Sequence, residues 1–384
     1  MNSFQVTSLC DLIQTTYNSK EVIPLHAPIF NGNEKKYIEE TIDSTFVSSV
    51  GKYVQDFEKN IAKFVGTNYA IATSSGTTAL HIALLASGCT SDSEVLTQSL
   101  SFVAGCNAIN YCNSHPVFID VEKDTLGMSP ESLESFLLSN CEIRNDGKCW
   151  NKKTNRVITA CLPTHVYGFS CRIDEIEKIC NKFNIILIED AAEALGSFYK
   201  ESHLGTYSRL AIFSFNGNKI ITTGGGGMVV TNNAKLAEKI KHLTTTAKVP
   251  HKWEFNHDDI GFNYRMPNIN AALGIAQLEK INFFLESKKK LSVTYKEWCN
   301  QNEVKFVEPI RGCKPNFWLN TIIVSDIKER NYILEETNKK FINTRPAWNL
   351  LHTLSMFKKY HAEDIPNSIW LFDRIINLPS SVNI

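Results

Sequence analysis

The chain has 384 residues, of which 43% are hydrophobic and 21% charged, and its 40 basic residues balance 40 acidic ones. These values are typical of a globular enzyme with two or three hydrophobic cores. Zero net charge argues against a nucleic-acid partner, and no run of about 20 apolar residues marks a membrane span. Because the N-terminus lacks a signal-peptide pattern, we expect a cytoplasmic protein. Eleven scattered cysteines form no zinc motif, so we expect reduced, mostly buried thiols and no metal site.

The first 250 residues predict an α/β domain. Apolar residues at helical spacing predict helices over 33–46 and 54–65. Short runs rich in Val, Ile and Phe then alternate with helical patterns and predict strands at Tyr69–Thr73, Pro116–Val121, Val157–Leu162, Ile185–Glu189, Leu210–Phe215 and Met228–Thr231. This alternation indicates a mostly parallel sheet covered by helices. The polar stretch 140–156 predicts a surface excursion.

The pattern changes after about residue 250. It predicts a long helix over 268–302, strands at 303–307 and 317–324, and a helix over 327–338. We therefore expect three parts. They are an N-terminal segment (1–32) that packs with a small domain, a large domain (33–250) and a small C-terminal α+β domain (251–384).

Residues that follow the strands are the first candidates for a site, because ligands bind at the carboxyl ends of parallel strands. Ser75-Gly76-Thr77-Thr78 follows the first strand and opens a helix, whose free N–H groups can bind a phosphate. The same residues can also serve only as an ordinary N-cap, with Ser75 or Thr77 as the capping residue. Both interpretations stay open here.

Two further strand ends carry ionisable residues. Asp190 needs a cation or hydrogen-bond donors if it is buried, or it caps a turn. Lys219 lies just before the glycine turn Gly224–Gly227, where a lysine can act as a nucleophile toward carbonyls or can simply be solvated. The glycine turn lacks the context of a dinucleotide-binding motif, which argues against a nicotinamide-dependent oxidoreductase.

These features, with the polar and aromatic loop Asp259–Pro267, occur in the order of a pyridoxal 5′-phosphate (PLP) site. From about Ile23 to the C-terminus the sequence resembles the DegT/DnrJ/EryC1/StrS family of sugar aminotransferases. The matching segments are Pro24–Asn33, Ser75–Leu80, Pro163–Gly168, Glu189–Gly196, Ser214–Lys219, Thr222–Gly227 and Gly261–Pro267. Segments that look most like the LegC branch are Thr45–Glu58, Phe215–Met228 and Arg345–Trp348.

The resemblance implies a fold type I (aspartate aminotransferase-like) PLP-dependent transferase that forms a homodimer with shared active sites. It implies that Lys219 forms the Schiff base with PLP and moves protons, and that Asp190 keeps the pyridine nitrogen protonated. Further contacts to the cofactor are implied for Gly76, Thr77, Thr78, Phe102, Glu193, Ser214 and Asn263, the last from the neighbouring subunit. Candidate contacts to the sugar nucleotide are Ser49, Tyr53, His165, Tyr167 and Arg265. For His165 a hydrogen-bonded structural role stays open, and for Phe102 a place in the core.

The implied reaction moves an amino group from L-glutamate to the C4 ketone of a nucleotide-linked 4-keto-6-deoxy sugar, UDP- or GDP-linked and N-acetylated. It would serve legionaminic acid or bacillosamine-type surface-sugar biosynthesis. One alternative is a PLP-dependent sugar dehydratase, although such family members replace the lysine by His. Another is a non-catalytic regulatory or scaffolding dimer, although loss of function usually removes Lys219 or Asp190, and both are present.

Two positions depart from the common family pattern. Glu193 stands where His or Gln is common, and Gly225 stands where many members carry Glu. Both departures fit the LegC branch. Cations are also needed near the diphosphate of the sugar nucleotide, and Lys52, Lys248 and Arg265 are the candidates.

Overall fold

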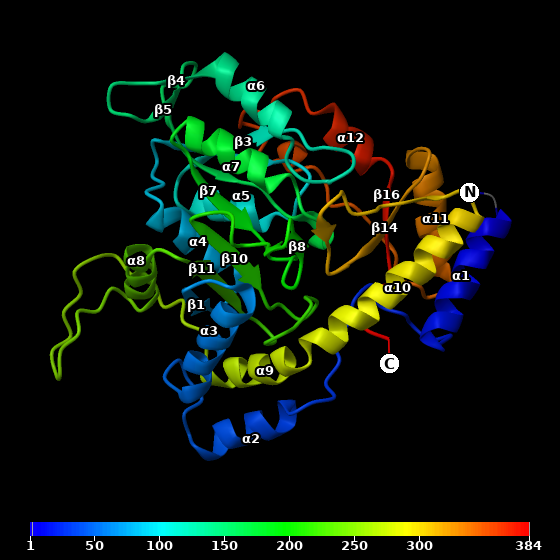
Figure 1. The fold of residues 1–384 in the computed structure, drawn as a ribbon, viewed down its shortest axis with the longest axis horizontal. Helices are drawn as coiled ribbons and strands as arrows, with labels where there is room; N and C mark the ends of the chain where they lie inside the picture. The colour runs from blue at the N-terminus through cyan, green and yellow to red at the C-terminus, as the bar shows by residue number, and fades with distance from the viewer. Residues whose placement is uncertain (2, 384) are drawn as a thin grey trace.

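A mixed β-sheet lies at the centre of the computed structural model, which describes Met1 and residues 3–383 (Figure 1). Its main strand order is β1-β11-β10-β7-β6-β2-β3. Strands from β10 to β3 run parallel, whereas β11 is antiparallel to both β1 and β10. The strands are β1 (Tyr69–Thr73), β2 (Ser93–Gln98), β3 (His115–Ile119), β6 (Val157–Leu162), β7 (Ile186–Asp190), β10 (Leu210–Ser214) and β11 (Gly227–Thr231). The predicted α/β fold with a mostly parallel sheet is confirmed.

Strand β2 lies between β6 and β3, and the sequence pattern did not predict it. Only two of its six residues are aliphatic, although all six are buried. Its polar side chains have partners inside the protein: Glu94 accepts a hydrogen bond from Asn151 (2.8 Å), and Thr97 donates to the carbonyl of Leu162 (3.1 Å). Polar residues can occupy an internal strand when such partners are present.

Helices cover both faces of the sheet, because successive side chains of a strand point to opposite faces. Ile212 packs in the cluster that contains α4, α5 and α8, whereas its neighbour Phe213 packs with α3, α6 and α7. These helices are α3 (Lys52–Val65), α4 (Gly76–Ala86), α5 (Ala104–Tyr111), α6 (Pro130–Asn140), α7 (Ile173–Lys182) and α8 (Ala234–Thr244). Helix α2 (Glu34–Asp43) lies farther from the sheet (Figure 1).

The predicted surface excursion 140–156 contains a β-hairpin. Strand β4 (Cys141–Ile143) pairs with β5 (Cys149–Asn151), and Trp150 pairs with Val157 of β6. This hairpin extends from the body of the protein at the upper left of Figure 1.

A second, antiparallel sheet has the order β12-β14-β16-β15 and packs with helices from both ends of the chain. One hydrophobic cluster joins residues of α1, α10, α11 and this sheet. The predicted helix 268–302 is two helices, α9 and α10, which meet at Lys280. The remaining elements are α1 (Ser3–Tyr17), α9 (Asn268–Glu279), α10 (Ile281–Gln301), α11 (Ile327–Lys339), α12 (Pro366–Phe372), β8 (Phe198–Tyr199), β9 (Ser202–His203), β12 (Lys305–Phe306), β13 (Cys313–Lys314), β14 (Asn320–Ile323), β15 (Arg345–Pro346), β16 (Ile375–Leu378) and the 3₁₀ turns η1 (Val166–Gly168) and η2 (Leu351–Thr353).

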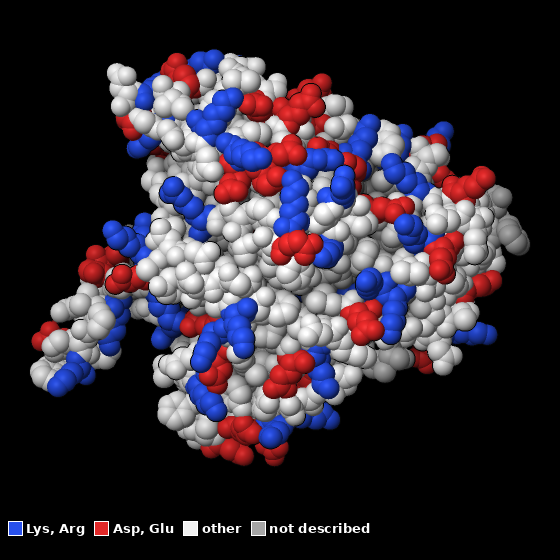
Figure 2. All heavy atoms as spheres, viewed as in Figure 1, with Lys and Arg blue, Asp and Glu red and all other residues white. Residues whose placement is uncertain are grey.

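The surface and the cysteines agree with the composition. On the face shown in Figure 2, basic and acidic side chains are interspersed. All eleven cysteines are buried free thiols, as expected. Within Met1 and residues 3–383, no helix is long and apolar enough to span a bilayer, and no three His, Cys, Asp or Glu side chains gather as a metal site.

Candidate active site

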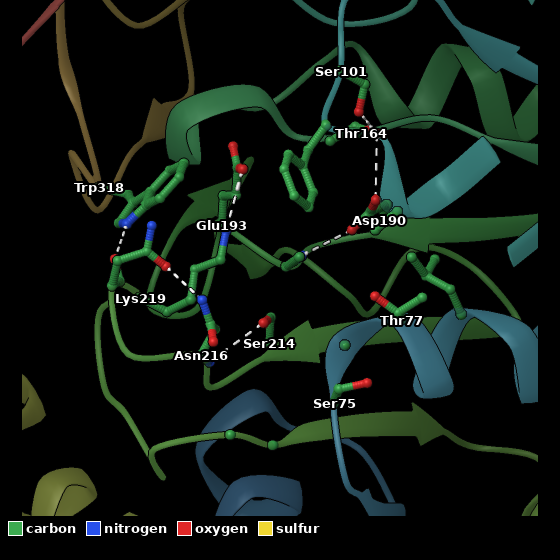
Figure 3. Close-up of a pocket in the computed structure, with 18 of the residues that line it drawn as sticks. Ser75, Thr77, Ser101, Thr164, Asp190, Glu193, Ser214, Asn216, Lys219 and Trp318 are labelled. Carbon is green, nitrogen blue, oxygen red and sulfur yellow. Dashed lines mark hydrogen bonds and ion pairs between the residues drawn. The ribbon is translucent and has the colours of Figure 1, made fainter. Parts of the chain in front are cut away.

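A cavity of about 330 Å³ opens where β7, β10 and the turn before α4 meet (Figure 3). It lies at the carboxyl ends of the parallel strands, where the sequence predicted it. The predicted residues that line it are Gly76, Thr77, Phe102, Asp190, Glu193, Ser214 and Lys219. The structure therefore brings together residues that are up to 143 positions apart (Gly76 to Lys219, 219 − 76).

The start of α4 lines one side of the cavity. Ser75 is the N-cap: its hydroxyl accepts a hydrogen bond from the Thr78 N–H (3.1 Å), and the Thr78 hydroxyl accepts one from the Ser75 N–H (3.0 Å). This capping box leaves the N–H groups of Gly76 and Thr77 without a partner inside the helix. A Cβ on Gly76 would lie only 2.9 Å from the Ser214 Cβ, so glycine is needed for Ser214 to approach. The N-cap and the phosphate-binding interpretations are thus compatible.

Asp190 ends β7 and is 5% exposed. Its carboxylate accepts hydrogen bonds from the Ala192 N–H (3.1 Å) and, at 3.5 Å, from the Thr164 hydroxyl. Burial raises the pKa of Asp190, and the nearby charge of Lys219 opposes that rise only in part. A buried carboxyl with so few donors is suited to a cationic partner such as a protonated ring nitrogen.

Lys219 follows β10 and points its amine into the same cavity (Figure 3). Its Nζ lies 3.2 Å from Oε1 of Glu193 and 3.9 Å from the centre of the Trp318 ring. The Lys219 and Glu193 side chains are 13% and 3% exposed. The alternative left open for Lys219, a simply solvated side chain, is therefore not what the structure shows.

Aromatic side chains form one wall of the cavity. Phe102 was predicted and is 51% exposed, so it is not a core residue. Trp318 and Trp348 were not predicted as site residues; their rings lie close to Tyr167, and that of Trp348 also lies close to Phe102. Trp348 belongs to the family-like segment Arg345–Trp348, which was the available signal.

Other lining residues were also missed. Ser101 follows the unpredicted strand β2, so its place was hidden with that strand. Thr164 follows the predicted strand β6, and Asn216 and Asn218 lie in the loop before Lys219. Thr164, Asn216 and Asn218 follow strands that the sequence predicted, and their position after those strands was the available signal.

Several predicted residues lie outside the cavity. His165 is fully buried and its Nε2 lies 3.0 Å from Glu189, which supports the structural interpretation that the sequence left open. Tyr167 is fully buried behind Trp348, and the Tyr53 hydroxyl donates to Glu40. The predicted residues that do not line the cavity are Ser49, Lys52, Tyr53, Thr78, His165, Tyr167, Lys248, Asn263 and Arg265.

A second cavity of about 460 Å³ shares Asn218, Trp318 and Trp348 with the first. Its lining also includes Arg345 and Asn349. Among the described residues that line it, none is acidic, whereas the first cavity contains two carboxyl groups. The two cavities therefore form adjoining chambers of different charge.

Comparisons with known proteins give the chain a family. Residues 28–384 match the DegT/DnrJ/EryC1/StrS aminotransferase family. The chain is 37% identical over 360 residues to GDP-perosamine synthase of Escherichia coli O157:H7, covering 93% of each, and 34% identical over 362 residues to GDP-perosamine synthase of Vibrio cholerae, covering 94% of each. Its fold matches that of the Helicobacter pylori aminotransferase PseC with a TM-score of 0.83 and 24% identity, over 94% of each chain.

The cavity also fits the cofactor that this family uses. A helix start with two free N–H groups and Ser214 suits a phosphate, Asp190 suits a protonated pyridine nitrogen, and Lys219 suits the aldehyde. The chain belongs to the DegT/DnrJ/EryC1/StrS aminotransferase family and is a PLP-dependent transaminase of fold type I.

Proposed function

We propose that this transaminase transfers the amino group of L-glutamate to the C4 ketone of a nucleotide-linked 4-keto-6-deoxy sugar. The observation that carries this proposal is the convergence of Lys219, Asp190 and the start of α4 on one cavity. The full-length relatives named GDP-perosamine synthases support a nucleotide sugar as acceptor and make GDP the first nucleotide to test.

PLP, when bound, supplies an electron-withdrawing ring that stabilises negative charge on the reacting carbon. Lys219 is assigned the proton transfers at that carbon, because its amine lies in the cavity. Asp190 holds the proton on the ring nitrogen. The N–H groups of Gly76 and Thr77 hold the phosphate together with Ser214, and Phe102 provides an apolar wall.

The second chamber is our candidate for part of the acceptor. Apolar faces of Trp318 and Trp348 suit the C–H face of a sugar ring, and the amides of Asn218 and Asn349 suit its hydroxyl groups. Arg345 is a cation for the diphosphate, and one of its guanidinium nitrogens already donates to Asn338 (2.8 Å).

The pathway is also part of this proposal. The resemblance to the LegC branch predicts a UDP- or GDP-linked, N-acetylated acceptor for legionaminic acid or bacillosamine-type sugars. The perosamine synthase relatives favour a GDP-linked acceptor. Both nucleotides therefore belong in the acceptor assay.

We further propose a homodimer in which each subunit completes the other's site. Asn263 is exposed and does not line the cavity of its own chain, which is compatible with a contact to a partner's cofactor. The loop before it projects from the body after α8 (Figure 1) and exposes Trp253, Phe255 and Ile260 by 72%, 77% and 82%. Light scattering, and the recovery of activity when Lys219→Ala and Asn263→Ala subunits are mixed, test this arrangement.

The first experiment is the ultraviolet-visible spectrum of the protein loaded with PLP, before and after L-glutamate. We expect a visible band that glutamate removes as 2-oxoglutarate forms, and that Lys219→Ala cannot form. Addition of a GDP- or UDP-linked 4-keto sugar then restores the band and yields the amino sugar. A 3-deoxy product would support the dehydratase alternative, and a protein that takes up no PLP would support the non-catalytic dimer.

A further inference from the structure

The amine of Lys219 already has two partners in the cavity. Its Nζ forms an ion pair with Glu193 (3.2 Å) and lies 3.9 Å from the centre of the Trp318 indole ring. A cation over the face of a tryptophan is attracted by the ring.

Glu193 is held firmly in this position. Its second carboxylate oxygen accepts a hydrogen bond from the backbone N–H of Tyr167 (2.8 Å). Tyr167 has a φ of +56°, a left-handed conformation that is unfavourable for a residue with a Cβ and persists only where surrounding contacts fix it. The backbone carbonyl of Glu193 accepts a further bond from the Asn316 side chain (2.8 Å).

The same Asn316 also positions Trp318. Its Oδ1 accepts the backbone N–H of Trp318 (2.8 Å), and the indole N–H donates to the carbonyl of Asn218, the residue before Lys219 (2.6 Å). Asn316 is 2% exposed. One buried amide therefore sets the distance between the carboxylate and the indole that hold the lysine amine.

We propose that Glu193 and Trp318 form a resting site for the Lys219 amine in every state in which that amine is not covalently engaged. This inference rests on the proposed transaminase function, in which the lysine is released and recaptured in each half-reaction. Glu193 is then a positioning residue: it keeps a flexible side chain beside the reacting atoms and lowers the entropy cost of each proton transfer.

The electrostatics of the cavity agree with this role. Burial raises the pKa of Glu193, the charge of Lys219 lowers it, and the neighbouring Asp190 raises it again. The lysine cation thus favours the charged form of this carboxylate, and the lysine has no comparable ion pair with Asp190 among the described residues.

The first test uses the cofactor-free protein. Lys219 and the exposed Lys290 are labelled with trinitrobenzenesulfonate at neutral pH, and their peptides are quantified by mass spectrometry. In Glu193→Gln we expect Lys219 to react about tenfold faster relative to Lys290, because the ion pair that holds its amine in place is lost. Glu142→Gln, which changes an exposed carboxylate paired with Arg144, is the matched control and leaves the ratio unchanged. An unchanged ratio in Glu193→Gln would overturn the proposal.

The second test measures an equilibrium. A contact present only when the lysine is free stabilises the aminated form of the enzyme, so its loss shifts the glutamate half-reaction toward the aldehyde form. We expect a shift of about tenfold in Glu193→Gln, the size of one hydrogen bond between charged groups. Trp318→Leu shifts the equilibrium in the same direction by less, and Trp318→Phe, which keeps a ring, by less still.

The outcomes separate the two proposals. Absence of the half-reaction in the unmodified protein refutes the proposed function. A normal half-reaction whose equilibrium is unchanged in Glu193→Gln refutes the resting site alone, even if the rate falls.

Discussion

Strand β7 ends in two adjacent carboxylates that have different surroundings. Glu189 is fully buried and accepts hydrogen bonds from a complete set of donors. These are His165 Nε2 (3.0 Å), Gly205 N–H (2.8 Å), Tyr207 N–H (3.0 Å), Ser208 N–H (2.9 Å) and the Ser208 hydroxyl (2.8 Å). Within residues 3–383, Asp190 has only the Ala192 N–H and a long contact from Thr164 as donors.

The two pKa values move in opposite directions. Burial alone would raise the pKa of Glu189, but its contacts with His165, Gly205 and Ser208 together lower it. For Asp190 burial dominates and the pKa is raised. A buried carboxylate whose donors are complete has a structural role, whereas one that lacks donors needs a ligand. Glu189 therefore holds the turn behind the site, and Asp190 serves the site itself.

The largest expected effect is on activity, from Asp190→Asn. The amide has the same shape but no charge to hold a protonated ring nitrogen, so kcat/KM for the glutamate half-reaction should fall about 10³-fold. Circular dichroism of the cofactor-free variant should match that of the unmodified protein. Full activity in the Asp190→Asn variant would contradict the functional role proposed for Asp190.

Glu189→Gln should instead reduce stability strongly and activity only slightly. The backbone N–H groups that now donate to the Glu189 carboxylate would meet an amide, whose NH₂ group cannot accept a hydrogen bond. We therefore expect the free energy of unfolding to fall by about 3 kcal/mol. Denaturant unfolding measures this loss, and activity per folded molecule should change far less than in Asp190→Asn. A stable but inactive variant would contradict the structural assignment.

The pH dependence of stability sharpens the contrast. Glu189 contributes stability above its ordinary pKa of 4.5, and that contribution is lost as the pH falls through its lowered folded value. Asp190 has the reverse sign: its contribution is present below its ordinary pKa of 3.8 and is lost as the pH rises through its raised folded value. In thermal unfolding of the cofactor-free protein, Glu189→Gln should flatten the acid limb, and Asp190→Asn should differ from the unmodified protein only above pH 3.8.

The smallest effect is expected from Thr164→Val. The valine keeps the shape but removes the hydroxyl that contacts Asp190 (3.5 Å) and Ser101 (3.0 Å). We expect a loss of about 1 kcal/mol, or roughly fivefold in kcat/KM, with stability nearly unchanged. A loss as large as that of Asp190→Asn would mean that the hydroxyl, and not the carboxylate charge, is the main contact.

Much of the fold was predictable because it follows from local patterns. Apolar runs revealed most strands of the large sheet, whereas β2 was hidden because its polar residues are satisfied by distant partners such as Asn151. The break between α9 and α10 at Lys280 involves no proline or glycine, so the helical spacing continued through it.

The site was predictable where its residues follow strands of one sheet. Asp190, Lys219 and the start of α4 are of this kind. Trp318 and Trp348 reach the cavity from the region of the second sheet, and only tertiary packing brings them there. His165 and Tyr167 follow β6 as site residues do, but both side chains are fully buried and neither lines the cavity.

Trp318 and Trp348 come late in the chain, and this order affects how the protein folds as it is translated. Trp318 donates to the carbonyl of Asn218, 100 residues earlier in the chain. A ribosome completes β11, and with it every strand of the large sheet, before it adds either tryptophan. Domains fold as they emerge, from the N-terminus onward. We therefore expect a nascent chain to present helix α4 and Lys219 first, and to retain its cofactor only once the two tryptophans have been translated and packed.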